Sequence, residues 1–332
     1  AELLQQCAIA LPNQRGISFV TKTVGGNQYW YMELVVGSTK RQYSLGRDTD
    51  ELRAQIEKQK KLFSQAAPDL KQREKLVAML VSGGGFAPGA SDGRVLEVLA
   101  QAGTFLTGGV LVGSHAFNTY GNMLGVSWAS AAMQTQDLDL ASLHQVEIAM
   151  RRDAPDVKSV LLESGMGFFE VPALNPKSPS TSFKLRGQEF KVDLLTPLEG
   201  PNTSKPVHLP HFKTFAHPMR FLEYLLDDSQ DPVIPFRSGV LVNVPNPARF
   251  ALHKLVVSQR RPVAQQTKVN KDIQQAEELL AVLLEDRPGD VCIALEAAEG
   301  MPAKFQQQLA EGMKYLSAGV KQALNGYSGG NG

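Results

Sequence analysis

Hydrophobic and polar residues alternate along the first part of the chain. The alternation over residues 17–22, 29–36 and 40–45 predicts three short strands, because residues two apart lie on one face of a strand. Residues 25–27 and 37–38, which are rich in Gly, Asn and Ser, are typical of the turns that join such strands. The chain is therefore expected to begin with a small β-hairpin module.

Helical periodicity follows this module and returns in the last third of the chain. Asp48 or Thr49 is expected to cap a charged helix that runs to about residue 64, and a second helix is predicted over 69–81. Beyond residue 210 the apolar spacing and the flanking breakers predict helices over 219–226, 247–261, 268–284 and 302–324. The C-terminal section is therefore expected to be helical.

The middle of the chain mixes both patterns. Helices are predicted over 91–103, 114–123 and 153–164, and strands over 110–112, 136–140, 183–186 and 190–195. We predict an α+β fold with an α/β core and three domains: a β-rich module with helices over 1–82, a core over 83–210 and a helical domain over 211–332.

The composition excludes several classes of protein but does not indicate a particular chemistry. The 34 basic and 33 acidic residues nearly cancel, so the whole chain carries no basic signature of a nucleic-acid-binding protein. The 2 cysteines exclude a disulfide scaffold and favour a reducing, cytoplasmic location. No apolar run is long enough for a bilayer span, and residues 1–11 lack the pattern of a secretory signal, so no membrane association is expected.

Two acidic strands carry the candidate chemistry. In the predicted strand over 136–140, Asp137 and Asp139 share one face while Leu138 and Leu140 face the core. Asp193 lies among apolar residues in the strand over 190–195, and pairing of the two strands would bring three carboxylates together. Neighbouring carboxylates repel unless a cation lies between them, which is the arrangement that two divalent ions need in phosphoryl transfer.

A Gly-Ser turn precedes the acidic strands. Gly113 and Ser114 lie where a predicted strand meets a predicted helix. A glycine backbone allows close approach of a phosphate, and a helix N-terminus offers free N–H groups. The turn is a candidate triphosphate site, although Ser114 is equally interpretable as an N-cap.

These residues together resemble the DNA polymerase β-like nucleotidyltransferase superfamily. Val112-Gly113-Ser114, then Asp137-Leu138-Asp139, then Asp193 on a neighbouring strand look like its motif. More narrowly, Tyr29-Trp30-Tyr31, residues 43–46 and residues 192–197 look like a bacterial family of such proteins. The resemblance implies a mixed sheet with flanking helices, an NTP such as ATP as substrate, and two Mg²⁺ ions, or Mn²⁺, at Asp137, Asp139 and Asp193.

The C-terminal section adds a basic contact to this resemblance. Residues 250–255, Arg260-Arg261 and Lys271-Asp272 resemble the helical part of abortive-infection and antibiotic-modifying nucleotidyltransferases. The resemblance implies that Lys254 contacts the triphosphate, and Arg261, seven residues on, shares its predicted helical face. Gly113, Ser114, Lys254 and Arg261 are therefore the predicted nucleotide-binding residues.

The acceptor stays open among RNA (including tRNA), protein and a small molecule. Two other functions are alternatives. The first is nucleic-acid binding on a nucleotidyltransferase scaffold, through aromatic and basic residues of the N-terminal strands: Lys22, Tyr29, Trp30, Tyr31, Lys40, Arg41 and Tyr43. Packing of those aromatics on the following helix explains the same pattern. The second is the toxin of a toxin–antitoxin pair, with an antitoxin as partner protein.

Overall fold

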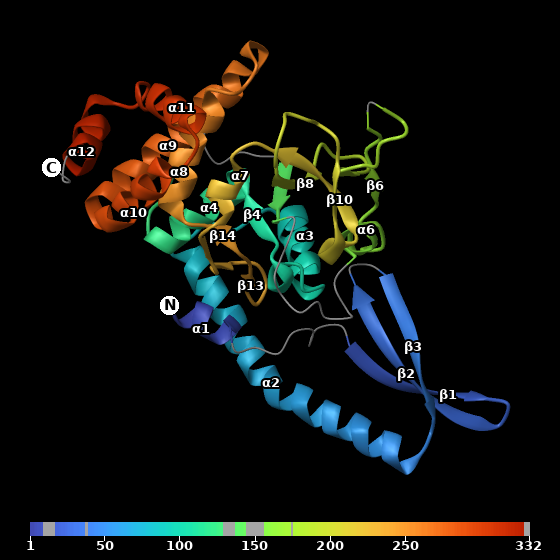
Figure 1. Cartoon of the computed structure of the whole chain (residues 1–332). Helices are drawn as coiled ribbons and strands as arrows, with labels where there is room; N and C mark the ends of the chain where they lie inside the picture. The colour runs from blue at the N-terminus through green and yellow to red at the C-terminus, as the bar shows by residue number, and fades with distance from the viewer. Residues whose placement is uncertain (9–16, 37–38, 129–136, 144–155, 174, 329–332) are drawn as a thin grey trace.

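The computed structural model (Figure 1) describes residues 1–8, 17–36, 39–128, 137–143, 156–173 and 175–328. Elements are α1 (Glu2–Ala8), β1 (Ile17–Val24), β2 (Asn27–Val36), β3 (Thr39–Arg47), α2 (Asp50–Ser82), α3 (Ala90–Gln101), β4 (Val110–Val112), α4 (Gly113–Leu124), β5 (Asp137–Ala141), α6 (Val157–Leu162), β6 (Phe168–Glu170), β7 (Ser182–Leu185), β8 (Lys191–Pro197), β9 (Val207–Leu209) and β10 (Thr214–Met219). After them come α7 (Leu222–Leu226), β11 (Ser229–Gln230), β12 (Val233–Ile234), β13 (Val240–Leu241), β14 (Val244–Pro245), α8 (Pro247–Ser258), α9 (Gln266–Asp286), α10 (Pro288–Glu299), α11 (Ala303–Met313) and α12 (Ala318–Ser328).

The N-terminal hairpin module is confirmed. Strands β1, β2 and β3 form an antiparallel sheet that stands away from the rest of the molecule, and α2 leads from it back to the other elements (Figure 1). The prediction of two helices over 50–64 and 69–81 is wrong, because α2 continues through Pro68. A proline removes one helical donor, and the neighbouring Lys, Glu, Gln, Ala and Leu residues favour the helix strongly enough to continue it. The cap is Thr49, whose side chain accepts a hydrogen bond from the Leu52 N–H at 3.3 Å.

A mixed sheet forms the centre of the molecule. Its strand order is β4-β5-β8-β10-β9, in which β5, β8 and β10 are parallel and the two edge strands β4 and β9 are antiparallel to their neighbours. The β6–β7 hairpin pairs with the first residues of β8, and β10 pairs with its last residues. This arrangement confirms the α+β class. Strands β9 and β10 pair across residues 210 and 211, where a domain boundary was predicted.

The C-terminal helices differ in detail from the sequence prediction. Helix α8 begins as expected, since the Asn246 side chain accepts a hydrogen bond from the Ala248 N–H at 2.9 Å. It ends at Ser258, so Arg261 lies beyond the helix rather than on it. The single helix predicted over 302–324 is two, α11 and α12, and α10 was not predicted. Helix α6 begins at Val157 with Asp156 as its N-cap, and residues 153–155 of the predicted helix lie outside the described residues.

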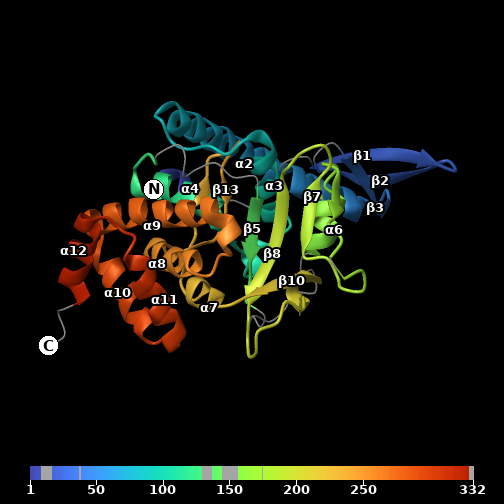
Figure 2. The ribbon, with the colours of Figure 1, turned by 90° about the horizontal axis from the view of Figure 1, so that it is seen from above.

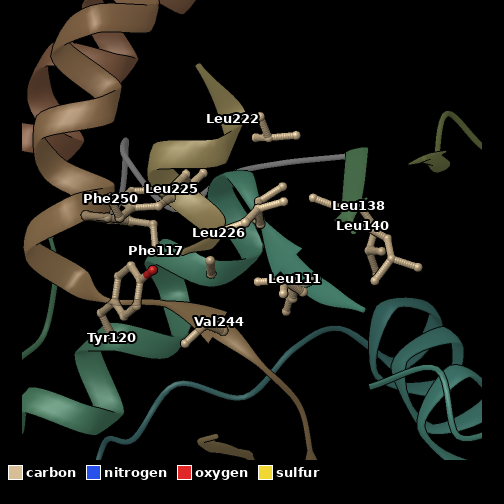
Figure 3. Close-up of a cluster of buried hydrophobic side chains, with 14 of the residues drawn as sticks. Leu111, Phe117, Tyr120, Leu138, Leu140, Leu222, Leu225, Leu226, Val244 and Phe250 are labelled. Carbon is tan, nitrogen blue, oxygen red and sulfur yellow. The ribbon is translucent and has the colours of Figure 1, made fainter. Parts of the chain in front are cut away.

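One hydrophobic core joins the sheet to these helices. Figure 3 shows part of this core, in which Leu138 and Leu140 of β5 belong to the same cluster as side chains from other elements: Leu111, Phe117, Tyr120, Leu222, Leu225, Leu226, Val244 and Phe250. Helix α8 is buried nearly all round, with Leu252, Leu255 and Val256 inaccessible to solvent, as the predicted apolar stripe requires. Figure 2 shows α8–α12 gathered on one side of β5 and β8. The acidic strands therefore rest on a rigid, well-packed frame.

A search of the described residues found no helix with the length and apolar character needed to cross a membrane.

Candidate active site

Asp137 and Asp139 lie on one face of β5. The two aspartates are partly exposed, while Leu138 and Leu140 between and beyond them are buried, so the predicted alternation is confirmed. The apolar residues pack into the core, which leaves the carboxylates to the opposite face of the sheet. The burial of two leucines thus holds two carboxylates side by side.

Asp193 joins them through strand pairing. Strand β8 runs parallel to β5 in a register that sets Asp193 opposite Asp139 and Lys191 opposite Asp137. The Asp193 carboxylate forms an ion pair with the Lys191 ammonium at 2.6 Å and accepts a hydrogen bond from the Ser182 hydroxyl at 2.5 Å. The expected pairing of the two acidic strands is therefore confirmed, and Lys191 and Ser182 are neighbours that the sequence prediction did not include.

Gly113 brings the Gly-Ser turn against the acidic strands. Val112 pairs with Asp139, and the next residue, Gly113, has a left-handed φ of 66°. A Cβ atom at Gly113 would lie 2.3 Å from Oδ2 of Asp139. Only glycine combines this backbone conformation with this closeness to a carboxylate. The turn and the acids are therefore parts of one site.

Ser114 occupies the second position of α4 and is buried. Val112 is the N-cap of this helix, so the interpretation of Ser114 as the cap is wrong. The Ser114 hydroxyl instead accepts a hydrogen bond from the Gln275 side-chain amide of α9 at 3.3 Å. Ser114 thereby links the turn to the C-terminal helices.

The carboxyl group of Asp139 is electrostatically strained. Burial, followed by the negative charges of Asp193 and Asp137, raises its pKa to about 6, against the opposing effect of Lys254 and Lys191. A carboxylate that is costly to ionise beside two others favours a cation. Asp139, with Asp137 on its own strand and Asp193 opposite it on β8, is therefore the carboxyl whose negative charge is opposed by its neighbours.

Lys254 and Arg261 meet on a buried carboxylate. The Lys254 ammonium lies 2.7 Å from Oδ1 of Asp272, and Arg261 donates a hydrogen bond to Oδ2 of the same side chain. Asp272 is 2 % exposed, and although burial alone would raise its pKa, Lys254 and Arg261 lower it. The structure thus brings together the two predicted basic contacts, at Asp272 of α9. Because Lys254 also lowers the pKa of Asp139, it links this ion-pair cluster to the acidic strands.

The acidic strands fit a divalent cation in part. Among the described residues, no group of three His, Cys, Asp or Glu side chains is arranged to enclose a metal ion by itself. Mg²⁺ usually needs only one or two carboxylates, because water and substrate phosphates complete its coordination. The strained Asp139, with Asp137 on the same face, meets that smaller requirement, whereas Asp193 is held by Lys191 and Ser182.

Asp272 and Gln275 could have been found from their spacing. In α9 the buried residues recur as Asp272, Gln275, Ala276, Leu279, Leu280 and Leu283, so two polar side chains continue an apolar stripe. Polar residues on a buried face need partners. Here those partners are Lys254 and Arg261 for Asp272, and Ser114 for Gln275. The spacing therefore indicates that Asp272 and Gln275 each have a polar partner, but it does not identify that partner.

The Gly-Ser turn thus packs against Asp139, which lies opposite Asp193 on the neighbouring strand. The chain belongs to a nucleotidyltransferase family, since the model of that family, described as "Nucleotidyltransferase", matches residues 91–298. A solved structure of an antigenic nucleotidyltransferase-like protein from Paracoccidioides brasiliensis is similar with a TM-score of 0.43 and 16% identity, covering 72% of this chain and 95% of that chain. No curated protein sequence matches the chain.

Proposed function

We propose that the protein transfers a nucleoside monophosphate from an NTP to a hydroxyl group, with Mg²⁺ bound at Asp137 and Asp139. The observation that carries the proposal is the register of β5 and β8, which sets Asp139 opposite Asp193 and leaves a carboxyl whose pKa is raised to about 6. When bound, the divalent cation would neutralise the phosphates and these carboxylates.

The residues of the chain have separate tasks in this proposal. The backbone at Gly113 and the start of α4 hold the β- and γ-phosphates, because free N–H groups and the helix dipole favour anions there. Asp193 accepts the proton of the acceptor hydroxyl as its oxygen bonds to the α-phosphorus. The bond from the α-phosphorus to the bridging oxygen breaks, and pyrophosphate leaves with that electron pair.

Lys254 would neutralise the charge that develops on the pyrophosphate. Its closeness to Asp139 supports this role, since its charge already lowers the pKa of that carboxyl. Arg261 helps to keep Asp272 ionised and so positions Lys254. A direct contact of Arg261 with the nucleotide, implied by the family resemblance, stays a prediction.

The test follows label from each α-³²P-labelled NTP, with Mg²⁺, into the RNA, protein and small-molecule fractions of a cell extract. We expect label in one fraction with the wild type and loss of at least a hundredfold with Asp137→Asn. Asp69→Asn, which removes an exposed carboxylate from α2, is the matched control and should label normally. Equal labelling by the wild type and Asp137→Asn would contradict the proposal. Circular dichroism would show that the variant is folded.

A further inference from the structure

A pocket with a mixed polar and apolar wall opens at the carboxyl ends of β8 and β10. Its volume is about 630 Å³, within the range of sites that hold small ligands. Leu198, Met219 and Val257 contribute apolar surface. The other contributors are mainly polar or basic: Asn202, Thr203, Ser204, His217, Arg220, Arg260, Arg261 and Gln265. Apolar surface beside guanidinium groups suits a ligand with both a flat apolar part and negative charge.

The charge of this pocket is one-sided. Its wall contains three arginines and no carboxylate. Arg261 is paired with Asp272, but within the described part of the chain neither Arg220 nor Arg260 forms an ion pair with a carboxylate. Arg220 donates to the carbonyl of Gly200 at 2.8 Å and to the Asn202 side-chain oxygen at 3.0 Å. Burial and the neighbouring positive charge of Arg220 lower the pKa of Arg260. Glu223 lies outside the pocket wall, and its carboxyl interacts electrostatically with Arg220. An anion in the pocket would relieve the repulsion between the two arginines.

The pocket lies beside the proposed active site rather than inside it. Leu198 is five residues beyond Asp193 along β8, which corresponds to about 16 Å of extended strand. Arg261 is part of the pocket wall, and its partner Asp272 also binds Lys254, whose charge acts on Asp139. An NTP at Gly113 would therefore leave the pocket open, and a ligand confined to the pocket would not reach Asp193.

We propose that this pocket, which we call the arginine pocket, holds the backbone of a single-stranded polynucleotide whose 3′ end is the acceptor. The proposal rests on the transferase function above and names its acceptor class. Phosphates contact Arg220 and Arg260, a base packs on Leu198, Met219 and Val257, and the terminal hydroxyl extends past Arg261 to the acidic strands. In the transfer, that hydroxyl oxygen bonds to the α-phosphorus, its proton passes to Asp193, and pyrophosphate leaves.

Binding of a fluorescent single-stranded RNA, measured by anisotropy without NTP, tests the arginine pocket apart from catalysis. We expect Arg220→Ala/Arg260→Ala to weaken binding at least tenfold, because charge-assisted hydrogen bonds are lost. The slope of log K against log salt should fall by about 0.7 for each phosphate contact removed. Arg186→Ala is the matched control, since this exposed arginine follows β7, before β8 begins. Its binding should equal that of the wild type.

Further arms separate the outcomes. Arg260→Glu, at an exposed side chain, should weaken binding even if the double variant is unstable. Asp137→Asn should bind RNA normally, so a failure of the transferase proposal would leave the binding result intact. Equal RNA binding by the wild type and both arginine variants, or no RNA binding by the wild type, would overturn the arginine pocket as an RNA site. The proposal would also be overturned if Arg220→Ala/Arg260→Ala no longer bound a non-hydrolysable NTP analogue but still bound RNA. The pocket would then be assigned to the NTP.

Discussion

Asp139, which is partly exposed on β5, and Asp272, which is buried on α9, have opposite electrostatics. Burial acts on both, yet the pKa of Asp139 is raised to about 6 whereas the pKa of Asp272 is lowered. Asp272 has two cations of its own, Lys254 and Arg261, while Asp139 faces two other carboxylates. Neighbouring charges, rather than burial, therefore decide which carboxyl is structural and which is available for a cation.

The largest change in the free energy of unfolding is expected from substitution of Asp272, the aspartate that has two cationic partners. Asp272→Asn leaves the buried Lys254 and the partly exposed Arg261 without the carboxylate that they share. Loss of one partner of a buried ion pair costs about 3–5 kcal/mol. Urea unfolding should show this loss in the free energy of unfolding. A change below about 1 kcal/mol would mean that the cluster contributes little to the fold.

The same substitution at Asp139 should have the opposite sign. Its pKa rises from 3.8 to about 6 on folding, so the folded chain binds more protons than the unfolded chain between these values. This carboxyl should therefore lower the stability of the metal-free wild type relative to Asp139→Asn by about 2–3 kcal/mol as pH rises from about 4 to about 6. The buried His115 and His253, whose pKa values are lowered to about 4 and about 3, act in the opposite direction in both proteins, so the difference between the two proteins is the quantity to measure. Asp139→Asn should lack the contribution of this carboxyl and be more stable than the wild type at pH 7 by a similar amount.

Urea unfolding across this pH range, with a chelator present, measures the difference. If Asp139→Asn were less stable than the wild type at pH 7, the ionised Asp139 carboxylate would be stabilised, not destabilised, by its surroundings. Loss of nucleotide transfer by the same, more stable variant would separate its role in function from its role in folding.

A smaller effect should come from Gly113. Gly113→Ala and Gly187→Ala both force a side chain into a left-handed conformation, at φ values of 66° and 74°. Only at Gly113 does the new Cβ meet a neighbour, Oδ2 of Asp139, because nothing lies within 4 Å at Gly187. We expect a loss of about 1 kcal/mol for Gly187→Ala and about 2 kcal/mol for Gly113→Ala. Transfer activity should be lost in Gly113→Ala alone; equal activities would separate the turn from the site.

Much of the candidate site was predictable because its signals are local. The alternation of Asp137, Leu138, Asp139 and Leu140 determines which side chains share a face, and the apolar flanks of Asp193 identify a second strand. Pairing of these strands was the expected result and is observed, and the structure adds that the pairing is parallel. The helices were harder: α2 continues through Pro68, and the predicted helix over 302–324 is divided into α11 and α12. Helix breaks depend on a balance of small local free energies.

The sequence by itself determined the acidic face of β5 and the mixed class of the fold, because both follow from the spacing of hydrophobic residues along the chain. Only the tertiary structure decided that Lys254 and Arg261 share Asp272, that Lys191 pairs with Asp193, and that an arginine-lined pocket lies beyond β8. Most of these contacts join residues that lie far apart in the sequence. Charge interactions depend on distance and burial, which are fixed only when the helices pack against the sheet.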